Sequence, residues 1–131
     1  MPTTTTAWAA TAACTGWHIG VAILDQAGTP KLYYIPDGTA GWHAYTSFRK
    51  ANTALLIKAP SEGVKDAVAA DAAVAAKYNA APTSFMTNPG GLPIVVNGET
   101  IGSIGVSGGD PGGKDKGCAT AGLAAIQARL K

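Results

Sequence analysis

Near the amino terminus of this 131-residue chain, apolar residues alternate with smaller or polar residues, which predicts a strand. In the stretch from Trp17 to Asp25, Ile19, Val21 and Ile23 recur at every second position, which is the period of a strand with one buried face. The turn sequence QAGTP follows, and then a second strand rich in β-forming residues over Lys31–Asp37. The short connection predicts an antiparallel hairpin.

A second hairpin is predicted near the carboxyl end, where two apolar stretches flank Asn97-Gly98. These stretches, GLPIVVN and TIGSIGVSG, cover residues 91–97 and 100–108. Asn-Gly is a strong signal for a two-residue hairpin turn because both residues tolerate positive φ. The stretch TSFMT at residues 83–87 is a further candidate strand, which brings the expected sheet to about five strands.

Helical periodicity separates the two hairpins. Apolar residues recur every three or four positions before Pro60, and Ser61 is predicted to cap the next helix, whose apolar side is mostly alanine. Four helices are predicted, at residues 7–14, 44–59, 61–81 and 113–131, with the threonines of the amino terminus as a frayed start. Strands joined by hairpins with helices packed on them predict one α+β domain over residues 1–131.

Composition excludes several classes of function. Charged residues make up 14% of the chain and the formal net charge is +2, with the basic residues scattered, so we expect no nucleic-acid partner. The apolar runs are too short to span a membrane, and we expect no membrane partner. The amino terminus lacks the basic and leucine-rich regions of a signal peptide, so a cytoplasmic location is predicted.

Two cysteines, Cys14 and Cys118, lie in alanine-rich segments predicted to be helical. Neither belongs to a C-x-x-C pair, so both are interpreted as buried free thiols. A disulfide between the first and last helices is the alternative, which the sequence leaves open.

Two glycine pairs, at residues 90–91 and 108–109, flank the second hairpin. They do not form a P-loop, because Asp115 follows Lys114 where Ser or Thr is required. A hairpin turning at Asn97 brings the two pairs close together beside a helix amino terminus. This arrangement predicts a small pocket that favours a carboxylate.

The segment around His43 holds the main candidate chemistry. A neutral imidazole can ligate iron or act as a general base, and Lys50, preceded by Arg49, can bind a carboxylate. The structural alternatives are a hydrogen-bonded histidine, a lysine salt bridge, and for Asp115 a residue that simply favours a helix start. No pair or cluster of residues has the spacing of a protein-only metal site, but haem needs only one or two axial ligands.

The segment GGLPIVVNGETIGSIGVSGG resembles the GlcG/HbpS-like haem-binding or haem-degrading family. Three further segments resemble that family in the same order: GVAILDQAGTPKLYYIPDG, FRKANTALLIKAPS and CATAGLAAI. The resemblance covers nearly the whole chain. It implies a profilin-like α+β domain, haem as a cofactor and assembly into a homo-oligomer.

The chain departs from the family pattern at Trp42, His43 and Tyr45, where relatives often carry small or aliphatic residues, and at YYIP, which replaces an arginine and a methionine. His43 and Lys50 are the predicted catalytic residues, and His43 is the predicted metal ligand. The predicted ligand-binding residues are Trp42, Tyr45, Arg49, Tyr33, Gly90, Gly91, Ser107 and Asp115.

Three functions are consistent with these residues. The first is haem binding or haem degradation, as the resemblance implies. The second is a small cofactor-independent enzyme that acts on an acidic or aromatic metabolite with His43 as general base. The third is a non-catalytic assembly or sensor subunit. For the first two, the partner is a small molecule that carries a carboxylate.

Overall fold

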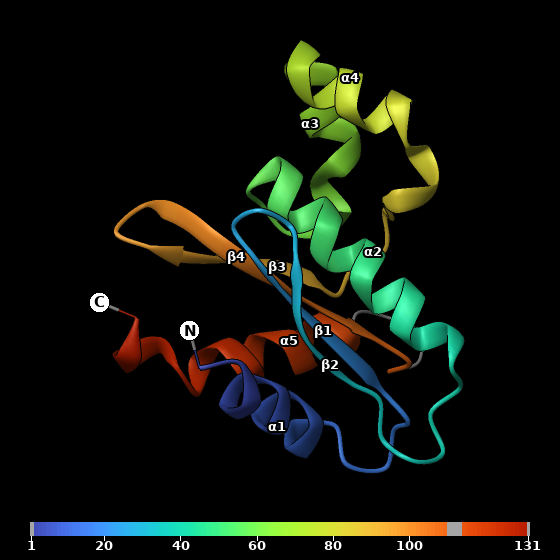
Figure 1. The fold of residues 1–131 in the computed structure, drawn as a ribbon, viewed down its shortest axis with the longest axis vertical. Coiled ribbons are helices and arrows are strands. Elements are labelled where there is room, and N and C mark those ends of the chain that lie inside the picture. Colours follow the sequence, from blue (N-terminus) through green and yellow to red (C-terminus); the bar gives the residue numbers. More distant parts are fainter. Residues whose placement is uncertain (1, 110–113, 131) are drawn as a thin grey trace.

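Four antiparallel strands form the sheet in the computed structural model, which describes residues 2–109 and 114–130 (Figure 1). The strand order is β2-β1-β4-β3. Strands β1 and β2 and strands β3 and β4 form the two predicted hairpins, and β1 pairs with β4 in the centre. The strand bounds are Gly20–Asp25, Pro30–Tyr34, Gly91–Val96 and Glu99–Ser107. The α+β class is therefore confirmed.

The turn between β3 and β4 has the predicted conformation. Asn97 has φ of 51° and Gly98 has φ of 80°, as a two-residue hairpin turn requires. Asp25 orders the turn between β1 and β2, since its Oδ1 accepts hydrogen bonds from the backbone N–H groups of Ala27 and Thr29. Both hairpins are therefore set by local interactions.

The expected fifth strand is absent from the described part of the chain. Residues Pro82–Ser84 form a 3₁₀ turn, and the residues after it run along α2 (Trp42–Ile57). Side chains of α2 satisfy this backbone: Asn52 donates to the carbonyl of Ser84, and Thr53 accepts from the N–H of Met86. The prediction of a strand at 83–87 was wrong because helix side chains replace the partner strand.

The two faces of the sheet carry side chains of different size. Val21, Ile23, Ile104 and Val106 pair across β1 and β4 and point toward α1 (Thr3–Ala13) and α5 (Lys114–Ala124), where they form the main core. The opposite face carries small residues such as Gly105, which lies under the backbone of α2. Figure 1 shows α2 on one side of the sheet and α1 with α5 on the other.

Helix α1 begins earlier than predicted. Its threonines are helical, and Thr6 is buried and donates from Oγ1 to the carbonyl of Pro2. Gly122 of α5 allows α1 to pack closely on α5, because a Cβ at Gly122 would lie 2.8 Å from the carbonyl oxygen of Thr6. Packing on α5 therefore orders residues that the sequence predicted to be frayed.

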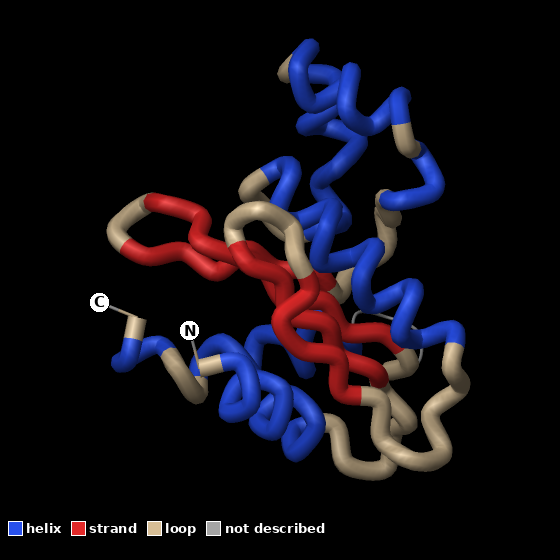
Figure 2. Tube along the Cα trace, viewed as in Figure 1, coloured by secondary structure: helices blue, strands red, loops and turns tan. Residues whose placement is uncertain are grey.

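The predicted helix at 61–81 is divided into a 3₁₀ turn at Ser61–Gly63, α3 (Val64–Ala70) and α4 (Ala72–Ala80). Asp71 causes the break, since its backbone is extended and its Oδ1 accepts from the N–H groups of Ala73 and Val74. Figure 2 shows that α3 and α4 lie away from the strands. No residue of α4 is buried.

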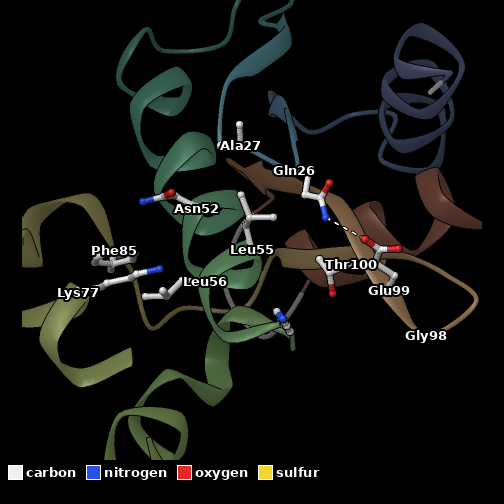
Figure 3. A pocket seen from close by; sticks show the side chains of 12 residues that line it. Gln26, Ala27, Asn52, Leu55, Leu56, Lys77, Phe85, Gly98, Glu99 and Thr100 are labelled. Carbon is white, nitrogen blue, oxygen red and sulfur yellow. Dashed lines mark hydrogen bonds between the residues drawn. The ribbon is translucent and has the colours of Figure 1, made fainter. Parts of the chain in front are cut away.

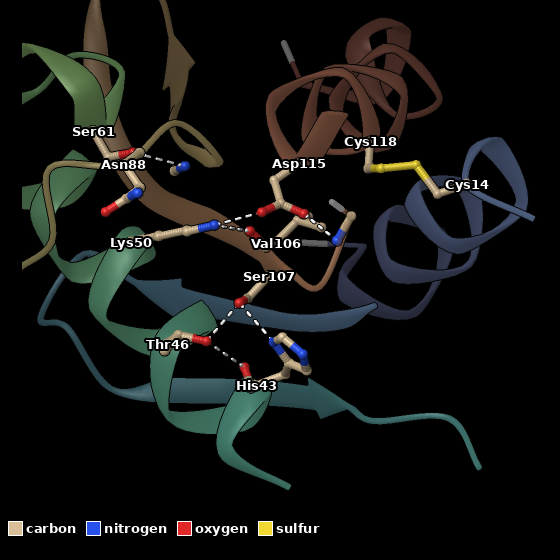
Figure 4. Close-up of polar contacts among 12 residues, drawn as sticks. Cys14, His43, Thr46, Lys50, Ser61, Asn88, Val106, Ser107, Asp115 and Cys118 are labelled. Atoms are coloured by element: carbon tan, nitrogen blue, oxygen red, sulfur yellow. Dashed lines mark hydrogen bonds and ion pairs between the residues drawn. A yellow bond between two sulfur atoms is a disulfide. The ribbon is translucent and has the colours of Figure 1, made fainter. Parts of the chain in front are cut away.

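Cys14 and Cys118 form a disulfide that joins the end of α1 to α5 (Figure 4). The interpretation as free thiols was therefore wrong. The two helices lie side by side on one face of the sheet, and the Cα atoms are 5.9 Å apart, which is within the range of a disulfide. The sequence could not show this contact, because 104 positions separate the two residues.

Removing this disulfide is expected to lower the free energy of unfolding by about 3–5 kcal/mol, because the crosslink closes a long loop and so restricts the unfolded chain. Urea denaturation of the oxidised protein, the reduced protein and a Cys14→Ser/Cys118→Ser variant would measure the effect. The reduced protein and the variant should unfold at the same lower urea concentration. Equal midpoints for all three would contradict the prediction.

None of the helices in residues 2–109 and 114–130 combines the length and apolar character needed to cross a bilayer.

Candidate functional site

A cavity of about 420 Å³ lies where the start of α2, the end of β4 and the first turn of α5 meet. Five of the residues predicted from the sequence line it. The lining residues are Trp42, His43, Lys50, Met86, Ser107, Gly108, Gly109 and Asp115. We call this cavity the His43 pocket.

His43 is held in the first turn of α2 by contacts on two sides (Figure 4). Its ring lies against that of Trp42, with 3.8 Å between centroids, and its Nδ1 lies 2.9 Å from Oγ of Ser107. Ser107 Oγ is also 2.5 Å from Oγ1 of Thr46. Ser107 can therefore accept from Nδ1–H while it donates to Thr46, which leaves the lone pair on Nε2.

The pKa of His43 lies below its usual value. Burial is the main cause, because it disfavours the charged ring; the positive charge of Lys50 lowers the pKa further, and the negative charge of Asp115 opposes both effects. The ring is therefore neutral at neutral pH, as required of a metal ligand or a general base.

Lys50 is buried, with 3% of its surface exposed, and its charge is neutralised within the protein. Its Nζ lies 2.6 Å from Oδ2 of Asp115 and donates to the carbonyl of Val106 at 3.0 Å. Asp115 Oδ1 accepts from the N–H of Gly109. This network joins α2, β4 and α5, and it commits Lys50 to Asp115 instead of to a ligand carboxylate.

Five of the eight predicted ligand-binding residues lie outside the lining of the His43 pocket, and three of these five, Arg49, Tyr45 and Tyr33, carry side chains. Arg49 donates from Nη2 to the carbonyl of Phe85, and its guanidinium lies 5.7 Å from the ring centroid of Tyr45. Tyr45 in turn donates to the carbonyl of Thr83, so both residues hold the segment after α4 against α2. Tyr33 lies on the edge strand β2, opposite Ala22, and is exposed.

The two glycine pairs have different roles. Gly90 and Gly91 are buried against α2, where a Cβ on Gly91 would collide with the carbonyl of Lys50. They are needed for close packing and do not line the His43 pocket. Gly108 and Gly109 do line the His43 pocket. Residues 110–113, which follow this second pair, lie outside the described part of the chain.

Two residues of the site were not predicted from the sequence. Thr46 lies three positions after His43, so helical spacing places both on one face of α2 and could have identified it. Met86 comes from the segment that was predicted as a strand, and no sequence signal pointed to it.

Comparison with known proteins identifies the family. The model of a family described as haem degrading protein HbpS-like matches residues 3–124. Protein GlcG of Escherichia coli is 33% identical over 97 residues, which are 70% of this chain but 65% of GlcG, so the match spans less than two thirds of that relative.

Solved structures give the same result. A double mutant of HbpS from Streptomyces reticuli is 29% identical, with a TM-score of 0.77 over 94% of this chain and 82% of that one. A complex of PduOC with heme is 24% identical, with a TM-score of 0.80 over 95% of this chain and 91% of that one, and at this identity the likeness shows the fold alone. Because the family model covers residues 3–124, the chain belongs to the haem-degrading HbpS-like family.

Proposed function

We propose that this protein binds haem in the His43 pocket, where His43 would hold the iron. The observation that carries the proposal is the neutral ring of His43, anchored through Nδ1 on Ser107 and lining the cavity. Histidines that ligate metals usually donate their other ring N–H to a protein group. The family description and the heme complex of a structural relative support haem as the ligand class.

The residues present fit such a ligand. Trp42 is 62% exposed and offers an apolar surface beside His43. Lys114, which lies 3.7 Å above the ring centroid of Trp17, is an exposed cation at the start of α5 that could meet a propionate. When bound, haem would supply redox chemistry. His43 would hold the iron, and Ser107 with Thr46 would keep the His43 ring in place.

Titration with haemin tests the proposal. Wild-type protein should give a Soret band that saturates at stoichiometric haemin, and His43→Ala should weaken binding at least about tenfold through loss of the bond to the iron. His18→Ala is the matched control, because His18 is the other histidine of the chain and is exposed. A wild-type protein without a specific band, or a His43→Ala variant with full affinity, would refute the proposal.

Acidification should weaken haem binding only at low pH. The lowered pKa of His43 means that the ring stays neutral until the pH falls below the usual histidine value of about 6.5. Affinity should be constant above that pH and should decline as the pH falls through the lowered pKa. Proton NMR of the haem-free protein, with His18→Ala to assign the ring signals, would measure the midpoint. A His43 midpoint at or above 6.5 would contradict the prediction.

The same geometry favours a second function, in which His43 is the general base of a cofactor-independent enzyme. A neutral imidazole beside the exposed ring of Trp42 suits proton abstraction from an aromatic or acidic metabolite. Turnover by the haem-free protein that is lost in His43→Ala would favour this function over haem binding.

We also infer that copies of the chain assemble into a homo-oligomer. The alanine-rich pair α3 and α4 supports this inference, since α3 buries only Val64 and α4 buries no residue within the single chain. A non-catalytic assembly or sensor role would use the same pair.

A further inference from the structure

We propose a second ligand site at the end of α2 opposite to His43, which takes a small monocarboxylate with an apolar body. A cavity of about 540 Å³ lies there, within the range of small-molecule pockets (Figure 3). Four parts of the chain meet around it: the β1–β2 turn, the end of α2, the β3–β4 turn and the segment that contains α4 and Phe85. We call it the Lys77 groove.

Apolar side chains form the floor of the groove. Leu55 and Leu56, from the last turns of α2, and Phe85 are among its lining residues, and in Figure 3 Leu56 lies toward Phe85 while Leu55 points toward Ala27. Leu55 also lies under the β1–β2 turn, where its Cδ2 would be 3.7 Å from a Cβ on Gly28. Such a floor favours a hydrocarbon group, because the ligand and the leucines lose contact with water together.

Two lysines supply the positive charge. Lys58 follows the last residue of α2, and Lys77 comes from α4. Within residues 2–109 and 114–130, neither lysine forms an ion pair, whereas Lys31, Lys50 and Lys116 each do. Both lysines lie near the carboxyl ends of helices, whose partial negative charge offsets only part of the two positive charges.

The negative charge lies on the other side of the floor. Glu99 accepts a hydrogen bond from Nε2 of Gln26 at 3.1 Å, and Figure 3 shows this pair across Leu55 from Lys77. The groove thus has Lys77 on one side, Leu55 in the middle, and a polar pair with one carboxylate on the side opposite to Lys77. A ligand with a single carboxylate and a short hydrocarbon chain would place its carboxylate near Lys77 and its chain on the leucines, away from the carboxylate of Glu99.

Ligands of equal length and different charge test the class of ligand. The ¹⁵N-labelled protein would be titrated with hexanoate, 1-hexanol and hexylamine, and the amide shifts of Gly28, Gly98 and Thr100 would be followed. Hexanoate should give saturable shifts, with an affinity about fivefold higher than that of the alcohol, as expected for an ion pair open to water. Equal binding of the alcohol, tighter binding of the amine or the absence of shifts would overturn the proposal.

Two charge variants are expected to change the affinity for hexanoate in opposite directions. Damage to the fold would lower the affinity in both, so the pair distinguishes ligand recognition from damage. Lys77→Met should weaken hexanoate binding about fivefold, whereas Glu99→Gln should strengthen it, because it removes a repelling charge and keeps an acceptor for Gln26. Lys65→Met, at an exposed lysine of α3, is the matched control and should change nothing. If Lys77→Met and Lys65→Met bind hexanoate equally, the site is not the Lys77 groove.

Two further measurements separate this site from the His43 pocket and from an interface. His43→Ala should retain full hexanoate affinity, so a failure of haem binding and a failure of this proposal are distinguishable. Light scattering over a dilution series tests whether a second copy of the chain covers the groove. Hexanoate shifts that appear only when an oligomer dissociates would overturn the proposal in favour of an interface.

Discussion

Lys50→Met should lower the free energy of unfolding by about 3–5 kcal/mol, because it leaves a largely buried carboxylate without its partner. The side chain of Asp115 is 14% exposed, and after the substitution the N–H of Gly109 would be the one donor left to it among the residues that the structure describes. The carbonyl of Val106 would also lose its bond from Nζ. Urea denaturation would measure the loss.

An exposed ion pair provides the matched control. Lys116 and Glu62 lie 2.7 Å apart, but their side chains are 42% and 33% exposed. Lys116→Met should therefore lower the free energy of unfolding by less than about 1 kcal/mol. The double variant Lys50→Met/Asp115→Leu should recover much of the stability lost in Lys50→Met, since removing both buried charges also removes the unpaired one. A Lys50→Met variant as stable as Lys116→Met would show that the buried pair is not important for the fold.

Gly105→Ala is expected to destabilise the protein by about 3 kcal/mol or more, because α2 would have to move away from the sheet. A Cβ at this position would collide with the carbonyl oxygen of Ser47 and would lie 2.7 Å from the backbone nitrogen of Ala51. Both atoms belong to the backbone of α2, so a change of side-chain rotamer cannot relieve the contact. Thermal and urea denaturation would measure the effect.

Gly117→Ala is the control for Gly105→Ala. Gly117 is exposed in α5, and a Cβ there would meet no atom within 4 Å. Alanine is the better helix former, so this variant should be as stable as wild type or more stable by up to about 1 kcal/mol. If both alanine variants were equally stable, the close approach of α2 to β4 would not constrain the fold.

Movement of α2 would also reach the His43 pocket. Helix α2 carries His43, Thr46 and Lys50, and their partners Ser107 and Val106 lie on β4. Gly105 of β4 allows α2 to lie close to the sheet. It thus contributes to the geometry of the His43 pocket without lining the pocket. Haem affinity should therefore fall in any folded fraction of Gly105→Ala and should stay unchanged in Gly117→Ala.

Local sequence determined the two hairpins, the body of α2 after its first two residues, and the α+β class. These features depend on interactions within a few residues: the alternation around Val21, the φ angles available to Asn97-Gly98, and the apolar period from Phe48 to Leu56. The motifs also indicated the family, and they identified His43, Trp42, Lys50, Ser107 and Asp115, which the structure places around one cavity.

Contacts between distant residues decided the rest. Side chains of α2, not a neighbouring strand, satisfy the backbone at 84–86, so the sheet has four strands. The packing of α1 on α5 brings Cys14 to Cys118. The packing of α2 on β4 buries Lys50, whose charge is balanced by Asp115, 65 positions away. These distances cannot be predicted from a local pattern, because each depends on how closely two elements pack in the folded protein. For α2 and the sheet, Gly91 and Gly105 permit the close packing.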